Sequence, residues 1–268
     1  MKAYNTNGLI HYKFNILEPF HEIRHFVTGR TGGFSNGPYH SLNLGFGTDD
    51  DPEIVLKNRK ALSGSLGIPL DWFVFPRQTH SANVAVVDYT HLGTGAYMRG
   101  DAIASTDALI TNCKNICIVV QVADCVPILL LDTGNSVIAT VHAGWRGTLQ
   151  NILSLTIEKM VVAFNTKPHD IVAAIGPSIG PCCYEVGEEL RKIFVESNSK
   201  NSKYFINFNK HFRFDLWAAN KNQLVQSGVK ESNIELAEIC TKCNNDKFFS
   251  SRAGNGNTGR FIAGIMLQ

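Results

Sequence analysis

The segment from His142 to Gly147 places a potential metal ligand close to an arginine that lies between glycines. An apolar run at 137–141 precedes it and predicts a buried strand. After it, apolar residues recur at helical spacing over 149–164. His142 is therefore expected at the end of a strand. Arg146 is expected just before a helix, where free backbone N–H groups favour anions such as phosphate, although a surface arginine is the alternative.

Two further polar clusters also follow apolar runs. The run 116–122 leads to Cys125, and the run 72–75 leads to His80. Three strand ends thus present His80, Cys125 and His142, a set of two nitrogens and one sulfur that suits a transition metal. Taken singly, each residue also has an ordinary interpretation, because a buried cysteine packs as a small hydrophobe and a lone histidine is commonly a core residue.

Five other residues are candidates around this set. Asp124 either orients a histidine ligand or makes a core hydrogen bond, since strand alternation points it away from the neighbouring cysteine. Gln78 can offer both a donor and an acceptor to a base or sugar. Arg30 and Ser35 belong to a glycine-rich loop that Asn43 follows. This loop either covers a ligand or is simply solvated.

These segments resemble the YfiH family, also called the laccase-domain or polyphenol oxidoreductase family, which includes the FAMIN-type purine nucleoside enzymes. Any one segment is weak, but together they follow the family's order nearly from end to end. The matching segments are Thr28 to Ser35, Ser41 to Gly45, Gln78 to His80, Ala123 to Cys125, His142 to Gly147, Gly176 to Gly180, Phe214 to Leu216 and Thr258 to Arg260.

The resemblance implies a zinc site whose ligands fall on His80, Cys125 and His142, which would then be the catalytic residues. Three protein ligands leave the fourth tetrahedral position open, as in catalytic zinc sites. It also implies two mixed sheets packed face to face with helices outside, and it makes Arg30, Ser35, Asn43, Gln78 and Arg146 candidates for substrate or phosphate contact.

The composition indicates an ordinary globular chain. The 268 residues are 44% hydrophobic and 18% charged, with a net charge of +2. The scattered basic residues predict no nucleic-acid footprint. The longest apolar stretch, 116–131, is interrupted by polar residues and proline, so no membrane span is expected. Seven cysteines without a signal peptide favour reduced thiols and the cytoplasm. The sequence does not determine the oligomeric state.

The order of elements favours an α+β fold, because strands and helices are mixed without strict βαβ alternation. No linker divides the chain, so one domain over residues 1–268 is expected. We predict an opening hairpin at 9–27, a loop at 28–47 and a strand-rich region at 72–143. Strands are expected at 171–175, 182–186, 234–239 and 261–267, and helices at 52–66, 148–164, 187–197 and 214–226.

Three other motifs do not predict sites. Residues 254–259 match GxGxxG, but an apolar strand follows where a dinucleotide site needs a helix. Cys240 and Cys243 form a CxxC pair without a second pair to complete a zinc site. Cys182 and Cys183 are adjacent, and they would face opposite sides of a strand, which favours ordinary packing.

Three functions remain open. The resemblance implies phosphorolysis of adenosine, inosine or methylthioadenosine, with adenosine deamination as a second activity, so that the partners are a nucleoside and phosphate. The older family label implies a copper polyphenol oxidase, yet none of the nine histidines forms the His-x-His pairs of multicopper centres. A single Cu²⁺ in the same site stays open. A cysteine hydrolase or peptidoglycan-editing factor would use Cys125 beside a histidine as its nucleophile.

Overall fold

Two six-stranded sheets and one three-stranded sheet form the frame of the computed structural model, which describes residues 1–209 and 211–268. The first sheet has the order β1 (Lys2–Thr6), β2 (Leu9–Lys13), β3 (Ile23–Thr28), β15 (Phe261–Leu267), β7 (Cys117–Val122), β4 (Phe73–Val74). The second has the order β14 (Ile234–Leu236), β10 (Ile171–Ile175), β8 (Val126–Asp132), β9 (Val137–Ala143), β6 (Ala108–Thr111), β5 (Val84–Val86). The third consists of β11 (Glu185–Val186), β13 (His211–Phe214) and β12 (Phe205–Phe208).

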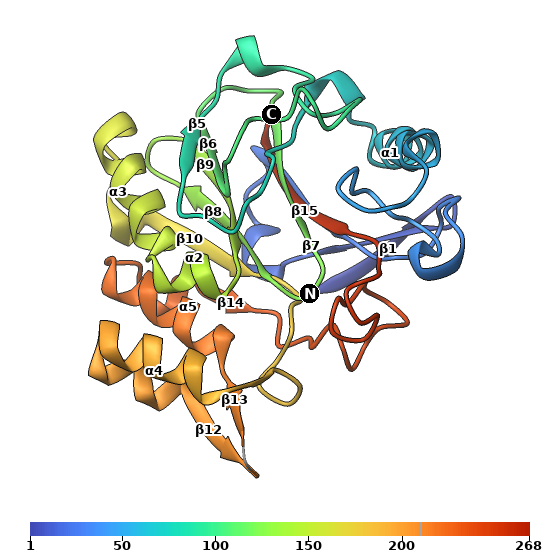
Figure 1. The fold of residues 1–268 in the computed structure, drawn as a ribbon. Helices are drawn as coiled ribbons and strands as arrows, with labels where there is room; N and C mark the ends of the chain where they lie inside the picture. Colours follow the sequence, from blue (N-terminus) through green and yellow to red (C-terminus); the bar gives the residue numbers. More distant parts are fainter. Residues whose placement is uncertain (210) are drawn as a thin grey trace.

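The helices lie on the two outer sides of this frame. They are α1 (Pro52–Leu66), α2 (Trp145–Leu149), α3 (Ile152–Phe164), α4 (Glu188–Ser197) and α5 (Leu216–Gln226). In Figure 1, α1 lies on the opposite side of the molecule from the other four. Both large sheets are mixed, because β4, β5 and β14 each pair in parallel whereas the remaining ladders are antiparallel.

Alternation along the central strands explains how the layers are held together. In β8, Leu129 packs in the core between the two sheets and Leu130 in the core beneath the helices. In β7, Val120 faces the other sheet and Val119 packs in a third core that includes Leu62 of α1. Both faces of each sheet are therefore covered, which is why these strands are apolar runs instead of alternating ones.

Much of the predicted element order is confirmed. The hairpin at 9–27 corresponds to the antiparallel pair β2 and β3. Helix α1 starts after Asp51, whose side chain accepts a hydrogen bond from the N–H of Glu53, and ends at Gly67 in the left-handed conformation. The two mixed sheets with outer helices are present, and the small third sheet was not expected.

Five elements differ from the prediction: one helix is divided, one strand is shorter, and three strands were not predicted. The helix expected at 148–164 is two helices, because Asn151 adopts φ 59° and interrupts it. The strand expected at 182–186 contains only Glu185 and Val186, since the residues before it form a turn. The strands β12 and β13 and the first strand β1 were missed.

Among the described residues no helix is long and apolar enough to cross a membrane.

Candidate active site

The structure brings His80, Cys125 and His142 together. One ligand atom from each lies within 4.8 Å of the others. His142 is the penultimate residue of β9, Cys125 lies in the short connection from β7 to β8, and His80 lies in the loop that follows β4. His142 is buried, whereas His80 is exposed, so the cluster has one side in the core and one side open. The predicted convergence of these three residues is therefore observed.

Strand register places Cys125 against the end of β9. Strands β8 and β9 pair antiparallel with Val126 opposite Ala143, so the residues just beyond them, Cys125 and Gly144, are neighbours. A Cβ atom at Gly144 would lie 3.0 Å from Sγ of Cys125 and 3.1 Å from a ring carbon of His80. Glycine at this position therefore leaves room for the three side chains to approach one another.

Asp124 has a structural role in the chain crossing from one sheet to the other. Its φ of 93° is unusual for a residue with a side chain. Its carboxylate accepts hydrogen bonds of 2.6 Å from the hydroxyl of Thr241 and from the backbone N–H of Arg252. Of the two interpretations left open by the sequence, the core hydrogen bond is the one observed.

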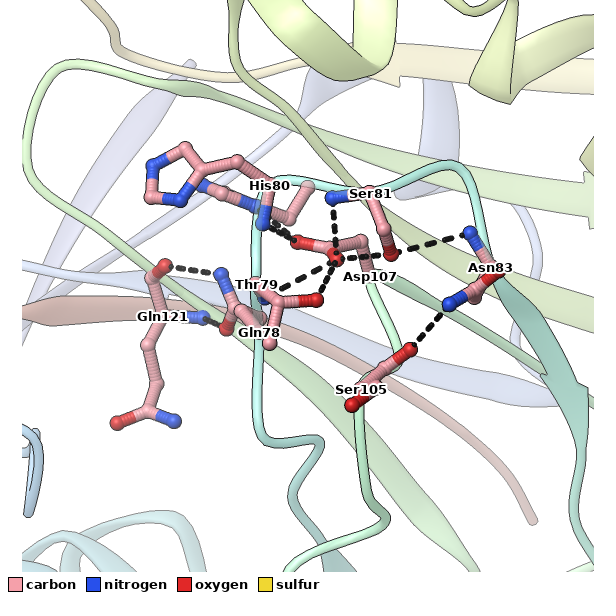
Figure 2. A network of polar contacts seen from close by, with 9 residues as sticks. Gln78, Thr79, His80, Ser81, Asn83, Ser105, Asp107 and Gln121 are labelled. Atoms are coloured by element: carbon pink, nitrogen blue, oxygen red, sulfur yellow. Dashed lines mark hydrogen bonds and ion pairs between the residues drawn. The ribbon is translucent and has the colours of Figure 1, made fainter.

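Asp107 orients the histidines instead. Oδ1 accepts a hydrogen bond of 2.8 Å from Nδ1 of His142 and one of 3.0 Å from the backbone N–H of His80. Oδ2 accepts from the backbone N–H groups of Thr79 and Ser81 and from the Ser81 hydroxyl. Figure 2 shows the loop wrapped around this carboxylate. One carboxylate thus fixes the ring of His142 and the conformation of the His80 loop.

Sequence reasoning missed Asp107. It directly precedes β6, and the register of β6 against β9 places it beside His142, whose N–H donates to its carbonyl at 2.8 Å. An acidic residue at the start of an apolar strand was the available signal. The sequence did not show that this strand pairs with the strand that carries His142.

The charges of the cluster stabilise one another. Burial alone would raise the pKa of the Cys125 thiol, but the charge of His142 and hydrogen bonds from His142 and His80 lower it to about 6. Burial alone would lower the pKa of His142, but Cys125 and Asp107 raise it to about 9. Despite burial, His142 and Ser81 hold the pKa of Asp107 well below its usual range. The lowered pKa favours the thiolate of Cys125, which is the form that binds metals or attacks electrophiles.

A cavity of about 610 Å³ opens beside the cluster and is lined by all three residues. This volume lies within the range of small-molecule sites. Its wall is rich in guanidinium groups and aromatic rings. The arginines are Arg59, Arg77, Arg99, Arg252 and Arg260, and the aromatic residues are Phe46, Phe75, Trp145 and Tyr184. Asp124 is the only acidic residue among the described residues of this wall, so the cavity favours an anionic ligand.

The five predicted contact residues divide into two groups. Gln78 lines the cavity, with its side-chain amide paired to the backbone N–H and C=O of Gln121 at 2.8 Å. Arg146 is exposed and stacks on Trp145, which does line the cavity. The prediction that Arg146 lies just before a helix was wrong, because α2 begins at Trp145 and includes Arg146 among its five residues.

The remaining three predicted contacts, Arg30, Ser35 and Asn43, hold loops together. Arg30 donates to the carbonyls of His40 and Asn245. The hydroxyl of Ser35 donates to Asp50. The Asn43 side chain accepts from the N–H of Arg260, a residue of the cavity wall. These three side chains are not among the described residues that line the cavity.

The four cysteines dismissed from the sequence form a second cluster. Cys182, Cys183, Cys240 and Cys243 have sulfur atoms within 4.8 Å of one another. The sequence treated the two pairs as separate, whereas the structure places the adjacent pair where the CxxC motif lacked a second pair. The two pairs are far apart in the sequence, and the structure makes each pair the complement of the other.

Known proteins are similar over almost the whole chain. Residues 24–268 match the family described as multi-copper polyphenol oxidoreductase laccase. A purine nucleoside phosphorylase of Bacteroides thetaiotaomicron is 37% identical over 95% of both chains. Adenosine deaminase RL5, from an unknown prokaryotic organism, is 37% identical over 93% of both chains.

Solved structures agree. YlmD from Geobacillus stearothermophilus is 32% identical, with a TM-score of 0.91 over 99% of this chain and 98% of that one. The Bacillus licheniformis protein YfiH is 30% identical, with a TM-score of 0.92 over 99% of both chains. The expected family is thus confirmed by both sequence and fold, and this chain belongs to the YfiH/YlmD family of laccase-domain proteins.

Proposed function

We propose that the protein is a zinc-dependent purine nucleoside enzyme. It cleaves adenosine, inosine or methylthioadenosine with phosphate to the free base and pentose 1-phosphate, and it also deaminates adenosine. The observation that carries this proposal is a cavity of about 610 Å³ that joins a metal-binding set to an arginine-rich wall. Relatives named purine nucleoside phosphorylase and adenosine deaminase match 95% and 93% of this chain.

The residues of the cluster fit a zinc ion. His80, Cys125 and His142 would hold it, since two imidazoles and one thiolate are common zinc donors and their atoms converge within 4.8 Å. Because Nδ1 of His142 donates its hydrogen to Asp107, Nε2 would be the atom that binds the metal. When bound, zinc with three protein ligands supplies Lewis acidity and lowers the pKa of a coordinated water to about 7.

Phosphate would bind to the guanidinium groups that the protein itself leaves unused. Within the described residues, the side chains of Arg77 and Arg99 donate no hydrogen bond, although both line the cavity. Arg77 lines the same cavity as His80, Cys125 and His142, so an anion held there would share the cavity with the cluster. Arg146 is a second proposed contact, because it stacks on Trp145 at the cavity wall. Asn43 would act indirectly, by holding Arg260 in place.

The purine would occupy the aromatic part of the wall. Trp145 and Tyr184 line the cavity and would supply aromatic contacts to the base, and Gln78 retains an amide hydrogen beyond its pairing with Gln121. The hydroxyl of Tyr184 would be a further donor to the base, and burial raises its pKa above the ordinary value. Because none of the seven cysteines is in a disulfide, a reducing compartment such as the cytoplasm suits the enzyme.

A thiol hydrolase is the second candidate, and a specific observation favours it. Cys125, His142 and Asp107 have the roles of nucleophile, base and orienting acid, and the pKa of Cys125 lies at about 6. Copper chemistry has less support. A blue-copper site wants a weak axial ligand such as methionine, and no methionine is among the described residues that line the cavity.

Incubation of metal-analysed protein with adenosine, with and without phosphate, tests the proposed function. We expect adenine and hypoxanthine only when phosphate is present, and inosine as the product when phosphate is absent. Chromatography of the products separates the two reactions. Turnover of neither kind would contradict the proposal.

Chelation separates the zinc enzyme from the thiol hydrolase. As a zinc ligand, Cys125 is shielded from iodoacetamide, so a chelator should abolish activity and expose the thiol together. Zinc added before alkylation should restore turnover. Rapid labelling of Cys125 in untreated protein that remains fully active in chelator would favour the hydrolase.

A further inference from the structure

Four cysteines from two distant segments converge at a place outside the cluster of His80, Cys125 and His142. Cys182 and Cys183 lie in the turn between β10 and β11, and Cys240 and Cys243 lie in the loop after β14. Sγ of Cys243 is 3.7 Å from Sγ of Cys182 and 3.4 Å from Sγ of Cys183. Every pair of the four sulfurs lies within 4.8 Å.

We propose that these four thiols bind a second zinc ion as a closed tetrathiolate site. A tetrahedral site with Zn–S bonds of about 2.3 Å places its sulfurs about 3.8 Å apart, close to the separations of 3.4 and 3.7 Å. A disulfide needs sulfurs about 2.05 Å apart, and the four residues are free thiols. Four protein donors complete the coordination sphere, so this zinc is structural where the first is catalytic.

The surroundings suit thiolate ligands. The backbone N–H of Gly180 donates to Sγ of Cys240 at 3.3 Å, and such hydrogen bonds to a ligand atom orient it and stabilise its charge. Cys240 is buried, whereas Cys182 and Cys243 are exposed. The ion can therefore enter from solvent and become anchored to the interior through Cys240.

The site would link two segments of the cavity wall. Ser178 and Cys240 already form an isolated parallel bridge, supported by the hydrogen bond from Thr241 N–H to the Ser178 carbonyl at 3.0 Å. The segment that contains Ser178 continues through Cys182 and Cys183 to Tyr184, which lines the cavity. The hydroxyl of Thr241 holds Asp124, next to Cys125. Zinc at the four cysteines would thus fasten the wall on which the neighbouring catalytic cluster rests.

Metal counting on single-cysteine variants tests the proposal. Elemental analysis and native mass spectrometry should give about two zinc ions per chain for the wild type and about one for Cys243→Ser. The control Cys113→Ser, at a cysteine outside both clusters, should keep both ions. A wild type with one ion that Cys125→Ala removes and Cys243→Ser retains would overturn the proposal.

Cobalt(II) gives a readout that does not depend on Cys243→Ser folding. In Cys125→Ala the first site has no thiolate, so intense sulfur-to-cobalt charge transfer must come from the four cysteines. Absence of this charge-transfer band would contradict the proposal. So would a count of five free thiols in denatured wild-type protein, because it would indicate a disulfide among the seven cysteines. Because no nucleoside turnover is measured, failure of the proposed function leaves this result interpretable. One ion that only Cys243→Ser removes would support the second site and count against the first.

Discussion

Asp107 shows how a single side chain can set the geometry of a whole site. Its two oxygens accept from the ring of His142 and from the N–H groups of three consecutive loop residues, including His80. His80 adopts φ 58°, a left-handed conformation that costs free energy in a residue with a side chain. These hydrogen bonds offset that cost and keep the imidazole directed toward Cys125. Asp107 is therefore a positioning residue for both histidines.

Replacing Asp107 with asparagine should weaken zinc binding by about 10- to 100-fold. The amide cannot match the charge of the carboxylate or accept all of its hydrogen bonds, so His142 and the His80 loop become less well ordered. Competition with a chromophoric chelator measures the affinity. Asp101→Asn, at an exposed carboxylate nearby in the sequence, is the control and should bind zinc normally. Equal affinity in both variants would contradict the positioning role.

Arg77→Ala should raise the KM for phosphate about tenfold, which corresponds to about 1.4 kcal/mol, with a smaller effect on the KM for nucleoside. The reason is the loss of a guanidinium that lines the cavity. Arg146→Ala should also raise the KM for phosphate, but by a smaller factor, since Arg146 contacts the cavity wall only through Trp145. Arg191→Ala, at a partly exposed arginine of α4 that pairs with Glu188 and does not line the cavity, should leave both constants unchanged. Steady-state kinetics with phosphate and nucleoside varied in turn measure both constants. A rise in the KM for nucleoside alone would contradict the assignment of Arg77 to phosphate.

At the scale of elements, strand β3 is linked to the segment after β2 by a hydrogen bond that requires the neutral form of His25. The ring of His25 is buried and its Nε2 accepts a hydrogen bond of 2.9 Å from the N–H of Phe14. Burial, together with the charge of Lys13, lowers the pKa of His25 from its ordinary value of 6.5 to about 4. A protonated ring can no longer accept this hydrogen bond.

Stability should therefore fall as the pH decreases from about 6.5 towards 4. In that window the unfolded chain binds a proton at His25 that the folded chain does not, which favours unfolding by up to about 3 kcal/mol. His25→Gln keeps an acceptor and does not titrate. Urea unfolding measures the free energy of unfolding at pH 7 and at pH 4.5. Its decrease between these two pH values should be about 2 kcal/mol smaller in the variant than in the wild type. Equal losses in the two proteins would assign the acid sensitivity to other groups.

At the scale of the whole molecule, the site depends on two sheets being held face to face. Strand β7 belongs to the first sheet and β8 to the second, and Cys125 lies where the chain crosses between them. Leu129 of β8 is fully buried in the core between the sheets. The packing that stabilises the fold is thus the packing that brings Cys125 to His142.

Leu129→Ala should lower the free energy of unfolding by about 2–5 kcal/mol, through lost apolar contact and the cavity left behind. Metal content under native conditions should be unchanged, because Leu129 lies in the interior of β8 and not at the end that carries the site. Leu155→Ala, at a half-exposed leucine of α3, should cost much less. Denaturant titration with elemental analysis checks both expectations. A similar loss in the two variants would contradict the proposed importance of the core between the sheets.

The sequence by itself determined the features that depend on neighbouring residues. Apolar runs predicted β10 and β15, and Asp51 with Pro52 predicted the start of α1. The motifs that contain His80, Cys125 and His142 predicted the site, because each motif follows an apolar run and their order resembles one family. The helix break at Asn151 was missed because asparagine can continue a helix or adopt φ > 0, and the sequence pattern does not distinguish the two.

Only the tertiary structure decided which distant segments meet. Asp107 reaches His142 through the pairing of β6 with β9, and Cys182 meets Cys243 through the contact of two loops. Hydrophobic periodicity records which face of an element is buried, but it does not record which strands become neighbours. Strand order depends on packing across the whole chain. For this reason the three candidate ligands were predictable one motif at a time, whereas the carboxylate that orients the histidines and the four-cysteine cluster emerged only from the fold.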